Sequence, residues 1–163
     1  MRRIRQQLTP EECVHILGRC TSGVLALAGD NGYPYAVPLS YVHSGGHIFF
    51  HSAPQGHKVD AIRRNDRCSF CVIERDDVKP LEFTTYYRSV IVFGRITVIE
   101  DDGEKLHALQ LLGQHYSPGD ESGLKHEIDK SLNRVVMLRL DIEHMTGKEA
   151  RELMQQRHGT GQG

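Results

Sequence analysis

The sequence predicts a mainly β protein: a small antiparallel barrel with flanking helices. About six strand-like segments follow one another, Gly- and Asn-rich turns separate several of them, and only a few helical segments intervene. The 163 residues suit one domain. We expect that domain over residues 1–150 and a tail, helical or disordered, over residues 151–163. A small barrel fills its interior with side chains, so a sizeable ligand should bind outside it, in a groove or at a subunit interface.

The first predicted element is a helix that begins after Thr9. Thr9 can cap it, Pro10 suits the first helical position, and Glu12 completes a capping box. Apolar residues then recur with helical spacing, and we expect the helix to end near Arg19.

Three strands are predicted over residues 22–53, separated by two turns. Residues 29–32, Gly-Asp-Asn-Gly, are typical of a tight hairpin because Asn-Gly tolerates positive φ angles. A second Gly-rich turn, residues 44–46, precedes the third strand. Pro38 lies inside the second strand and indicates an edge, a bulge, or a place where something other than a strand approaches.

A short helix over about residues 58–64 and a strand over residues 67–74 come next. The polar residues 75–86 predict a loop. Residues 87–101 are too long for an average strand of about 5–6 residues, so we expect a bend at Gly94.

The rest of the chain predicts a helix over about residues 103–115, with Leu106, Leu109 and Leu112 on one face. A mixture of loop and short helix follows, and residues 134–150 close the sheet, with a turn expected at Gly147.

Cysteine and histidine spacings do not favour a metal site. Cys68 and Cys71 have the CxxC spacing, but they fall in a predicted strand, where residues three apart face opposite sides. We therefore interpret them as core cysteines. His43, His47 and His51 are spaced by four, but a turn separates the first two and breaks the helical spacing that a metal site would need.

The composition is that of an ordinary soluble globular protein. A net charge of −1 with 25% charged residues argues against general binding to nucleic acid or to a membrane surface. No apolar run approaches the roughly 18 residues of a membrane span. The basic start lacks the apolar core of a signal peptide, so we expect a cytoplasmic protein.

The start of the short helix at residues 58–64 carries two basic side chains where they are not expected. His57 and Lys58 lie at a helix N-terminus, whose partial positive charge repels cations. A bound phosphate would explain both, because backbone N–H groups, the helix dipole and Lys58 would converge on it, with the hydroxyl of Ser52 nearby. Alternatively, both side chains face solvent and Asp60 balances the dipole.

Three stretches resemble the flavin-binding split barrel, the fold of pyridoxamine 5'-phosphate oxidase. They are TSGVLALAGDNGYPYAVPLSYV, FHSAPQGHKVDAIRRNDRCSFCVI and YYRSVIVFGRITVIED. Within that superfamily the sequence is most similar to the nitroimidazole-resistance (Nim) family, on the pair GYPYAVPLSYV and FHSA…GHK…RRND. The similarity runs from Arg2 to Ala150.

The resemblance implies an antiparallel, Greek-key-like split barrel that forms a homodimer with two flavin mononucleotides (FMN) in its interface. One strand would line the isoalloxazine ring, partly through its backbone. Its residues are Ala36, Val37, Pro38 and Leu39.

Three further pairs are implied to bind the cofactor. His51 and Ser52 would approach the ribityl chain and phosphate, and His57 and Lys58 would hold the phosphate. His57 is also the candidate catalytic residue. Arg88 and Ser89 would reach the flavin from the other subunit.

The implied function is an FMN-dependent reductase of nitroimidazole-type nitro compounds. One alternative is a pyridoxamine phosphate oxidase, although the C-terminus offers only Arg151 and Arg157 for its second phosphate. Another is a non-catalytic flavin or haem module, in which His51 or His57 could bind iron. No GxGxxG follows a strand, so no dinucleotide domain is predicted.

Overall fold

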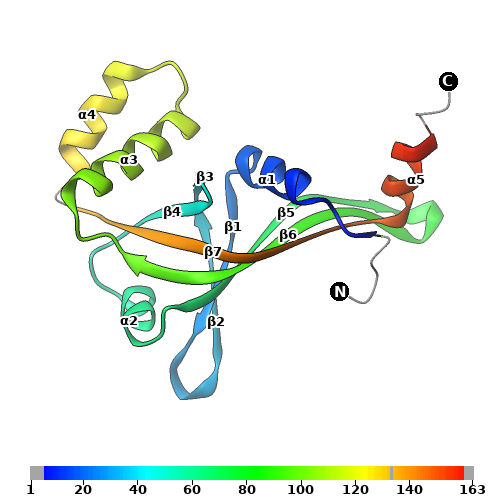
Figure 1. The fold of residues 1–163 in the computed structure, drawn as a ribbon, viewed down its shortest axis with the longest axis horizontal. Helices are drawn as coiled ribbons and strands as arrows, with labels where there is room; N and C mark the ends of the chain where they lie inside the picture. The colour runs from blue at the N-terminus through cyan, green and yellow to red at the C-terminus, as the bar shows by residue number, and fades with distance from the viewer. Residues whose placement is uncertain (1–5, 133, 160–163) are drawn as a thin grey trace.

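One antiparallel sheet dominates the computed structural model, which describes residues 6–132 and 134–159 (Figure 1). Its strand order is β2-β1-β5-β6-β7-β4-β3. The strands are β1 Ser22–Ala28, β2 Pro34–Ser40, β3 Val42–Ser44, β4 His47–Ser52, β5 Arg67–Lys79, β6 Thr84–Val98 and β7 Val136–Glu149.

Helices flank this sheet, and the first begins as the sequence predicts. The Thr9 hydroxyl accepts a hydrogen bond from the Glu12 N–H at 3.2 Å, and the Glu12 carboxylate accepts one from the Thr9 N–H at 2.8 Å. This capping box starts the helix by satisfying two backbone donors. The helices are α1 Pro10–Arg19, α2 His57–Arg64, α3 Asp102–Tyr116, α4 Glu121–Ser131 and α5 Arg151–Gly159.

The sheet curls into a barrel that stays open along one seam. Its two edge strands, β2 and β3, are joined by Tyr41 alone, and they do not pair with each other in the described part of the chain. Tyr41 is fully buried, and its hydroxyl donates a hydrogen bond to the Leu17 carbonyl at 2.9 Å. α1 thereby closes one end of the core, and the predicted split-barrel architecture is confirmed.

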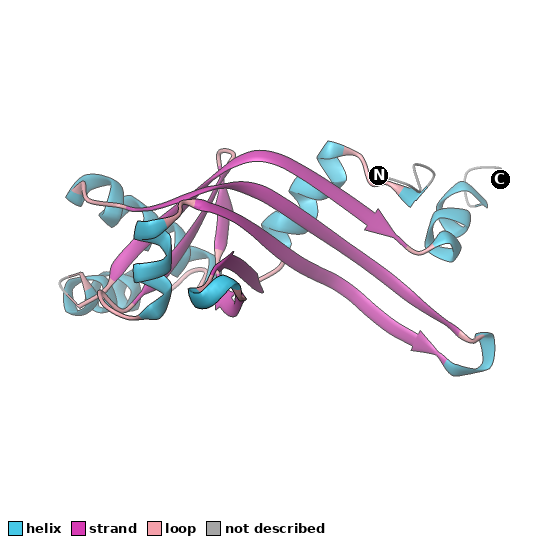
Figure 2. Cartoon of the chain, turned by 90° about the horizontal axis from the view of Figure 1, so that it is seen from below, coloured by secondary structure: helices cyan, strands magenta, loops and turns pink. Residues whose placement is uncertain are grey.

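The three long strands β5, β6 and β7 extend beyond the barrel, and we call these extensions the arms. The β5–β6 hairpin forms their tip (Figure 2). The loop predicted over residues 75–86 is therefore wrong, because β5 continues to Lys79 and β6 begins at Thr84 after a 3₁₀ turn. The end of β5 is rich in charged side chains, so its sequence is typical of a loop rather than of a strand. Asp77 is paired with Arg75 and Lys79 at 2.9 Å each, along one strand that is held by backbone pairing to β6.

Residues 22–53 form four strands rather than the predicted three, because Tyr41 interrupts the second one. The predicted helix over residues 103–115 is confirmed as α3. Leu109 and Leu112 are buried in it as expected, but Leu106 is 37% exposed. Cys68 is buried, which confirms it as a core residue, whereas Cys71 is only half-buried, on the other face of β5. None of the described helices is long and apolar enough to cross a membrane.

Gly94 and Gly147 both lie where another part of the backbone or a side chain approaches closely. A bend is predicted at Gly94, and the β6–β7 register shifts there within one continuous strand, where a Cβ atom would lie 2.0 Å from the Asp141 carbonyl oxygen. The turn predicted at Gly147 is wrong, because this residue lies within β7. A Cβ atom there would lie 2.5 Å from the Cys13 sulfur, so glycine permits the close approach of α1 to the sheet.

Candidate functional site

The first turn of α2 carries a lysine, Lys58, that has no ion-pair partner in the part of the chain that the structure describes. Gly56, which precedes it, has φ +130°, a conformation that favours glycine, and no side chain of the described residues caps the N–H groups of this turn. Lys58 is half-buried and forms no ion pair within the described residues. Burial lowers the pKa of Lys58, because desolvation penalises the ammonium form. Helix dipole, N–H donors and ammonium group together suit an anion.

His57, in contrast, is tied to the β1–β2 hairpin. Its Nδ1 lies 3.4 Å from Asp30 Oδ2, and its ring packs edge-on against Tyr35 at 4.5 Å between centroids. Arg64 binds the same aspartate, with 2.5 Å between its Nη1 and Asp30 Oδ1. These contacts anchor both ends of α2 to the hairpin and place the helix start beside β2. Sequence reasoning missed the role of Asp30, because an aspartate is an ordinary residue in a tight turn and needs no partner there.

The four predicted ring-lining residues divide between the two faces of β2. Ala36 and Pro38 are exposed on the outer face, whereas Val37 and Leu39 are half-buried and pack against the core. β2 is an edge strand, as Pro38 indicated. Two small side chains therefore form the middle of the outer surface of β2, and Val37 and Leu39 could meet a ligand there only through their backbone.

His51 and Ser52 do not converge. Neighbours on a strand point to opposite faces, and here Ser52 is 6% exposed on the barrel side of β4. His51 is exposed on the other side and lines a cavity of about 280 Å³ between the strands and the helices α3 and α4. Sequence reasoning missed this cavity, because the helix residues that enclose it read as ordinary apolar packing.

Tyr116 fixes α3 against the barrel at the edge of this cavity. Its hydroxyl accepts a hydrogen bond from the Tyr41 N–H at 3.1 Å and donates one to the Thr21 carbonyl. Hydrogen bonds between the end of α3 and the backbone of Thr21 and Tyr41 therefore fix one edge of the cavity.

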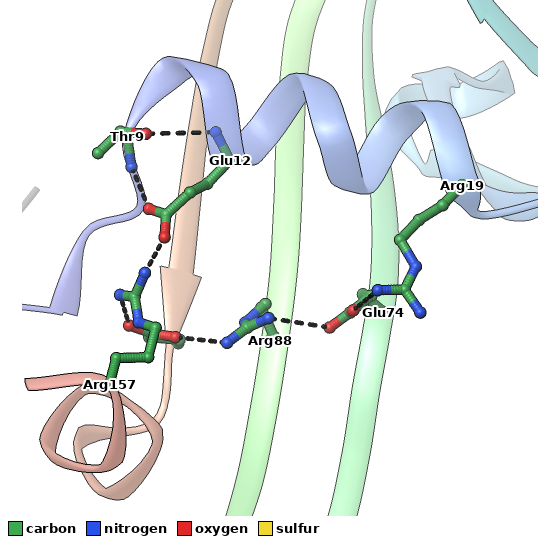
Figure 3. A network of polar contacts seen from close by, with 7 residues as sticks. Thr9, Glu12, Arg19, Glu74, Arg88 and Arg157 are labelled. Atoms are coloured by element: carbon green, nitrogen blue, oxygen red, sulfur yellow. Dashed lines mark hydrogen bonds and ion pairs between the residues drawn. The ribbon is translucent and has the colours of Figure 1, made fainter. Parts of the chain in front are cut away.

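Arg88 and Ser89 lie on β6, where they pair with Glu149 and Lys148 near the end of β7. Arg88 donates a hydrogen bond to Glu149 at 3.0 Å and lies 3.9 Å from Glu74, beneath α1 (Figure 3). Ser89 follows on the opposite face of β6. One chain therefore does not bring this pair to the start of α2, and their contact with a flavin stays a prediction that requires a second chain.

Solved structures of other proteins share this fold, and some of those proteins bind FAD. A FAD-binding protein from Mesorhizobium loti is 33% identical, with a TM-score of 0.64, over 89% of this chain and 97% of that one. A candidate 5-nitroimidazole antibiotic resistance protein from Bacteroides thetaiotaomicron is 23% identical, with a TM-score of 0.75, over 88% and 86%. The FAD and haem binding protein of Mycobacterium smegmatis is 24% identical, with a TM-score of 0.77, over 90% and 74%.

The two structures below 25% identity show a shared fold and no more than that. The family model described as pyridoxamine 5'-phosphate oxidase matches residues 9–149, which include the whole sheet and the start of α2. By this match the chain belongs to the pyridoxamine 5'-phosphate oxidase family.

Proposed function

We propose that this protein is a flavin-dependent oxidoreductase that holds FMN at the start of α2. The observation that carries the proposal is Lys58, a half-buried cation without an ion-pair partner among the described residues, beside uncapped backbone N–H groups. His57 and Arg64 are already paired with Asp30. Lys58 is then the remaining cation of the first turn among the described residues, and one cation there matches the single phosphate of FMN. The flavin bound by the Mesorhizobium loti relative supports the cofactor class.

The outer face of β2 would support the flavin ring. Ala36 and Pro38 leave room for a planar group to lie against the strand, and Pro38 has no N–H to leave unsatisfied there. When bound, the flavin would supply hydride and electron transfer, while the chain binds and orients it. His57 is the proposed catalytic residue, and Asp30 would orient its imidazole. The proposed acceptor is a nitro compound of the nitroimidazole type, which the fold similarity to the Bacteroides protein supports.

The absorption spectrum of the untreated protein tests this function. We expect the two broad bands of an oxidised flavin near the visible–ultraviolet boundary, and one FMN released per chain on denaturation. After anaerobic reduction, a nitroimidazole should restore the bands. Protein that carries no flavin and takes up none would contradict the proposal. A flavin that the nitroimidazole fails to reoxidise would contradict the proposed acceptor.

A flavin or haem module without turnover is the second candidate, favoured by the fold similarity to the FAD and haem binding protein of Mycobacterium smegmatis. His51 is the exposed histidine of β4 and has no side-chain partner within the described part of the chain, so it could bind haem iron. One intense Soret band in the same spectrum, lost in a His51→Ala variant, would favour this candidate.

We further propose that a second copy of the chain covers an apolar face of the sheet. On the side away from α1, exposed apolar side chains lie next to one another across the ladder. A barrel this small cannot enclose a flavin alone, so a homodimer would complete the site. The side chains are Val24 on β1, Ile73 on β5, and Ile91 and Phe93 on β6.

Phe93→Glu should therefore convert the dimer into a monomer. Phe93 is 46% exposed and stacks on His144, and a carboxylate there would be buried without a partner in the interface. Sedimentation should give about twice the 18.4 kDa chain mass for the wild type and the single mass for the variant. Val14→Glu, on the exposed side of α1, serves as control and should stay dimeric. An unchanged mass in Phe93→Glu would contradict the placement of the interface.

A further inference from the structure

We propose that the cavity between β4 and the helices α3 and α4 is the site of the electron acceptor. It would take a compact, uncharged ring compound that carries an oxygen, and it would reject phosphorylated or other anionic compounds. This inference rests on the proposed function, because it places the acceptor beside the flavin.

The position of the cavity next to the outer face of β2 supports this assignment. Ser40 lines the cavity and ends β2, two residues beyond Pro38 on the same exposed face. Residues two apart on a strand are about 7 Å apart. The cavity therefore begins where the proposed flavin surface ends, and an acceptor in its mouth would lie next to the ring.

Two polar groups at this end have no partner within the described residues. They are the His51 imidazole and the Ser40 hydroxyl, both of which line the cavity. Each can donate a hydrogen bond to an oxygen of a ligand. The remaining walls come mainly from apolar side chains of α3 and α4, namely Leu109, Leu112, Leu124 and Ile128.

The size of the cavity sets the size of the ligand. Its volume of about 280 Å³ lies just below the roughly 300–1,000 Å³ found for small-molecule pockets. One or two fused rings fit this space better than a larger cofactor. Apolar walls favour a ring, and the two donors favour a carbonyl or nitro oxygen at its edge.

Charge determines what is excluded. The lining residues in the described part of the chain include no lysine or arginine, and Glu127 contributes a carboxylate. That carboxylate accepts a hydrogen bond from the Ser131 hydroxyl at 2.9 Å, and the Lys130 ammonium lies 3.9 Å from it, outside the lining. An anionic ligand would meet the Glu127 charge with no compensating cation in the wall.

The experiment compares two quinones of the same ring system: menadione, which is neutral, and 1,4-naphthoquinone-2-sulfonate, which is anionic. Binding to the oxidised protein is measured by equilibrium dialysis. The rate is then measured anaerobically with protein whose flavin has been reduced by one equivalent of dithionite. The quinone gains two electrons from that flavin, together with two protons, and leaves as the hydroquinone.

Leu124→Trp should fill the cavity and weaken menadione binding at least tenfold, with a matching fall in rate at low menadione. Leu124 is half-buried and lines the cavity opposite Gly113 of α3, so the larger ring would extend into the cavity, and circular dichroism should show that the variant keeps its fold. Lys125→Trp, at the next and exposed position, is the control and should bind menadione as the wild type does. Glu127→Lys should increase the affinity for the sulfonate more than that for menadione.

Equal menadione affinity in Leu124→Trp and Lys125→Trp, with flavin content unchanged, would overturn this inference and leave the proposed function standing. Equal affinity of the wild type for both quinones would overturn the exclusion of anions. Wild-type protein without flavin would overturn the proposed function and this inference with it.

Discussion

Replacing Lys58 by methionine should weaken FMN binding about ten- to hundredfold. A hydrogen bond to a charged group contributes about 1.5–3 kcal/mol, and each 1.4 kcal/mol is a factor of ten in Kd. Methionine keeps a similar apolar stem in the half-buried position, so α2 should remain folded. Fluorescence titration of the flavin-free protein measures the change. Arg63→Met is the control, because Arg63 lies exposed in the last turn of the same helix and should leave the Kd unchanged.

The pH dependence gives a second readout for Lys58. A phosphate binds the protonated ammonium, and burial lowers the pKa of Lys58 from its ordinary 10.5. The affinity of wild-type protein should therefore fall as pH rises through the lowered pKa. Above pH 8 the phosphate itself no longer titrates, since its second pKa is about 6. The Lys58→Met variant should lack this alkaline decline. A variant with wild-type affinity and the same decline would show that the phosphate binds elsewhere.

Local signals in the sequence predicted most of the elements around the candidate site. The capping box at Thr9 and Glu12 identified the start of α1, and the Asn31-Gly32 turn, with both residues at positive φ, identified the β1–β2 hairpin. Lys58 stood out because its charge conflicts with the helix dipole, and that conflict is visible within one turn. Each of these signals depends on residues that are close together in the chain.

What the sequence did not predict depends on distant contacts. The arms of β5 and β6 carry charged side chains, and only their pairing with each other makes them strands. Asp30 is 27 positions from His57, so its ion pair could not be read from local spacing. The opposite orientation of His51 and Ser52 could have been predicted, since the alternation of a strand separates neighbours. Their adjacency in the chain therefore places them on opposite faces of β4 rather than in one site.

Glu149→Gln should destabilise the protein by about 3–5 kcal/mol, the range for removing one partner of a buried ion pair. Glu149 is 1% exposed and binds the guanidinium groups of both Arg88 and Arg157. Without its charge, Arg88 keeps Glu74 at 3.9 Å as its one partner among the described residues, within which the Arg88 Nε is already buried without a hydrogen bond. Urea unfolding measures the loss. Glu143→Gln, on the same strand, removes an exposed pair with Arg95 and should cost at most about 1 kcal/mol.

A double-mutant cycle separates the ion pair from the packing of Glu149. Arg88→Met removes the cation that Glu149 compensates, so adding Glu149→Gln to it should cost less than Glu149→Gln does alone. The difference should be about 0.5–3 kcal/mol, the range found for residues in direct contact. Additive costs would mean that Glu149 stabilises the fold through Arg157, which links α5 to Glu12 of α1, rather than through Arg88. Limited proteolysis would then report the release of α5 in Glu149→Gln and not in Arg88→Met.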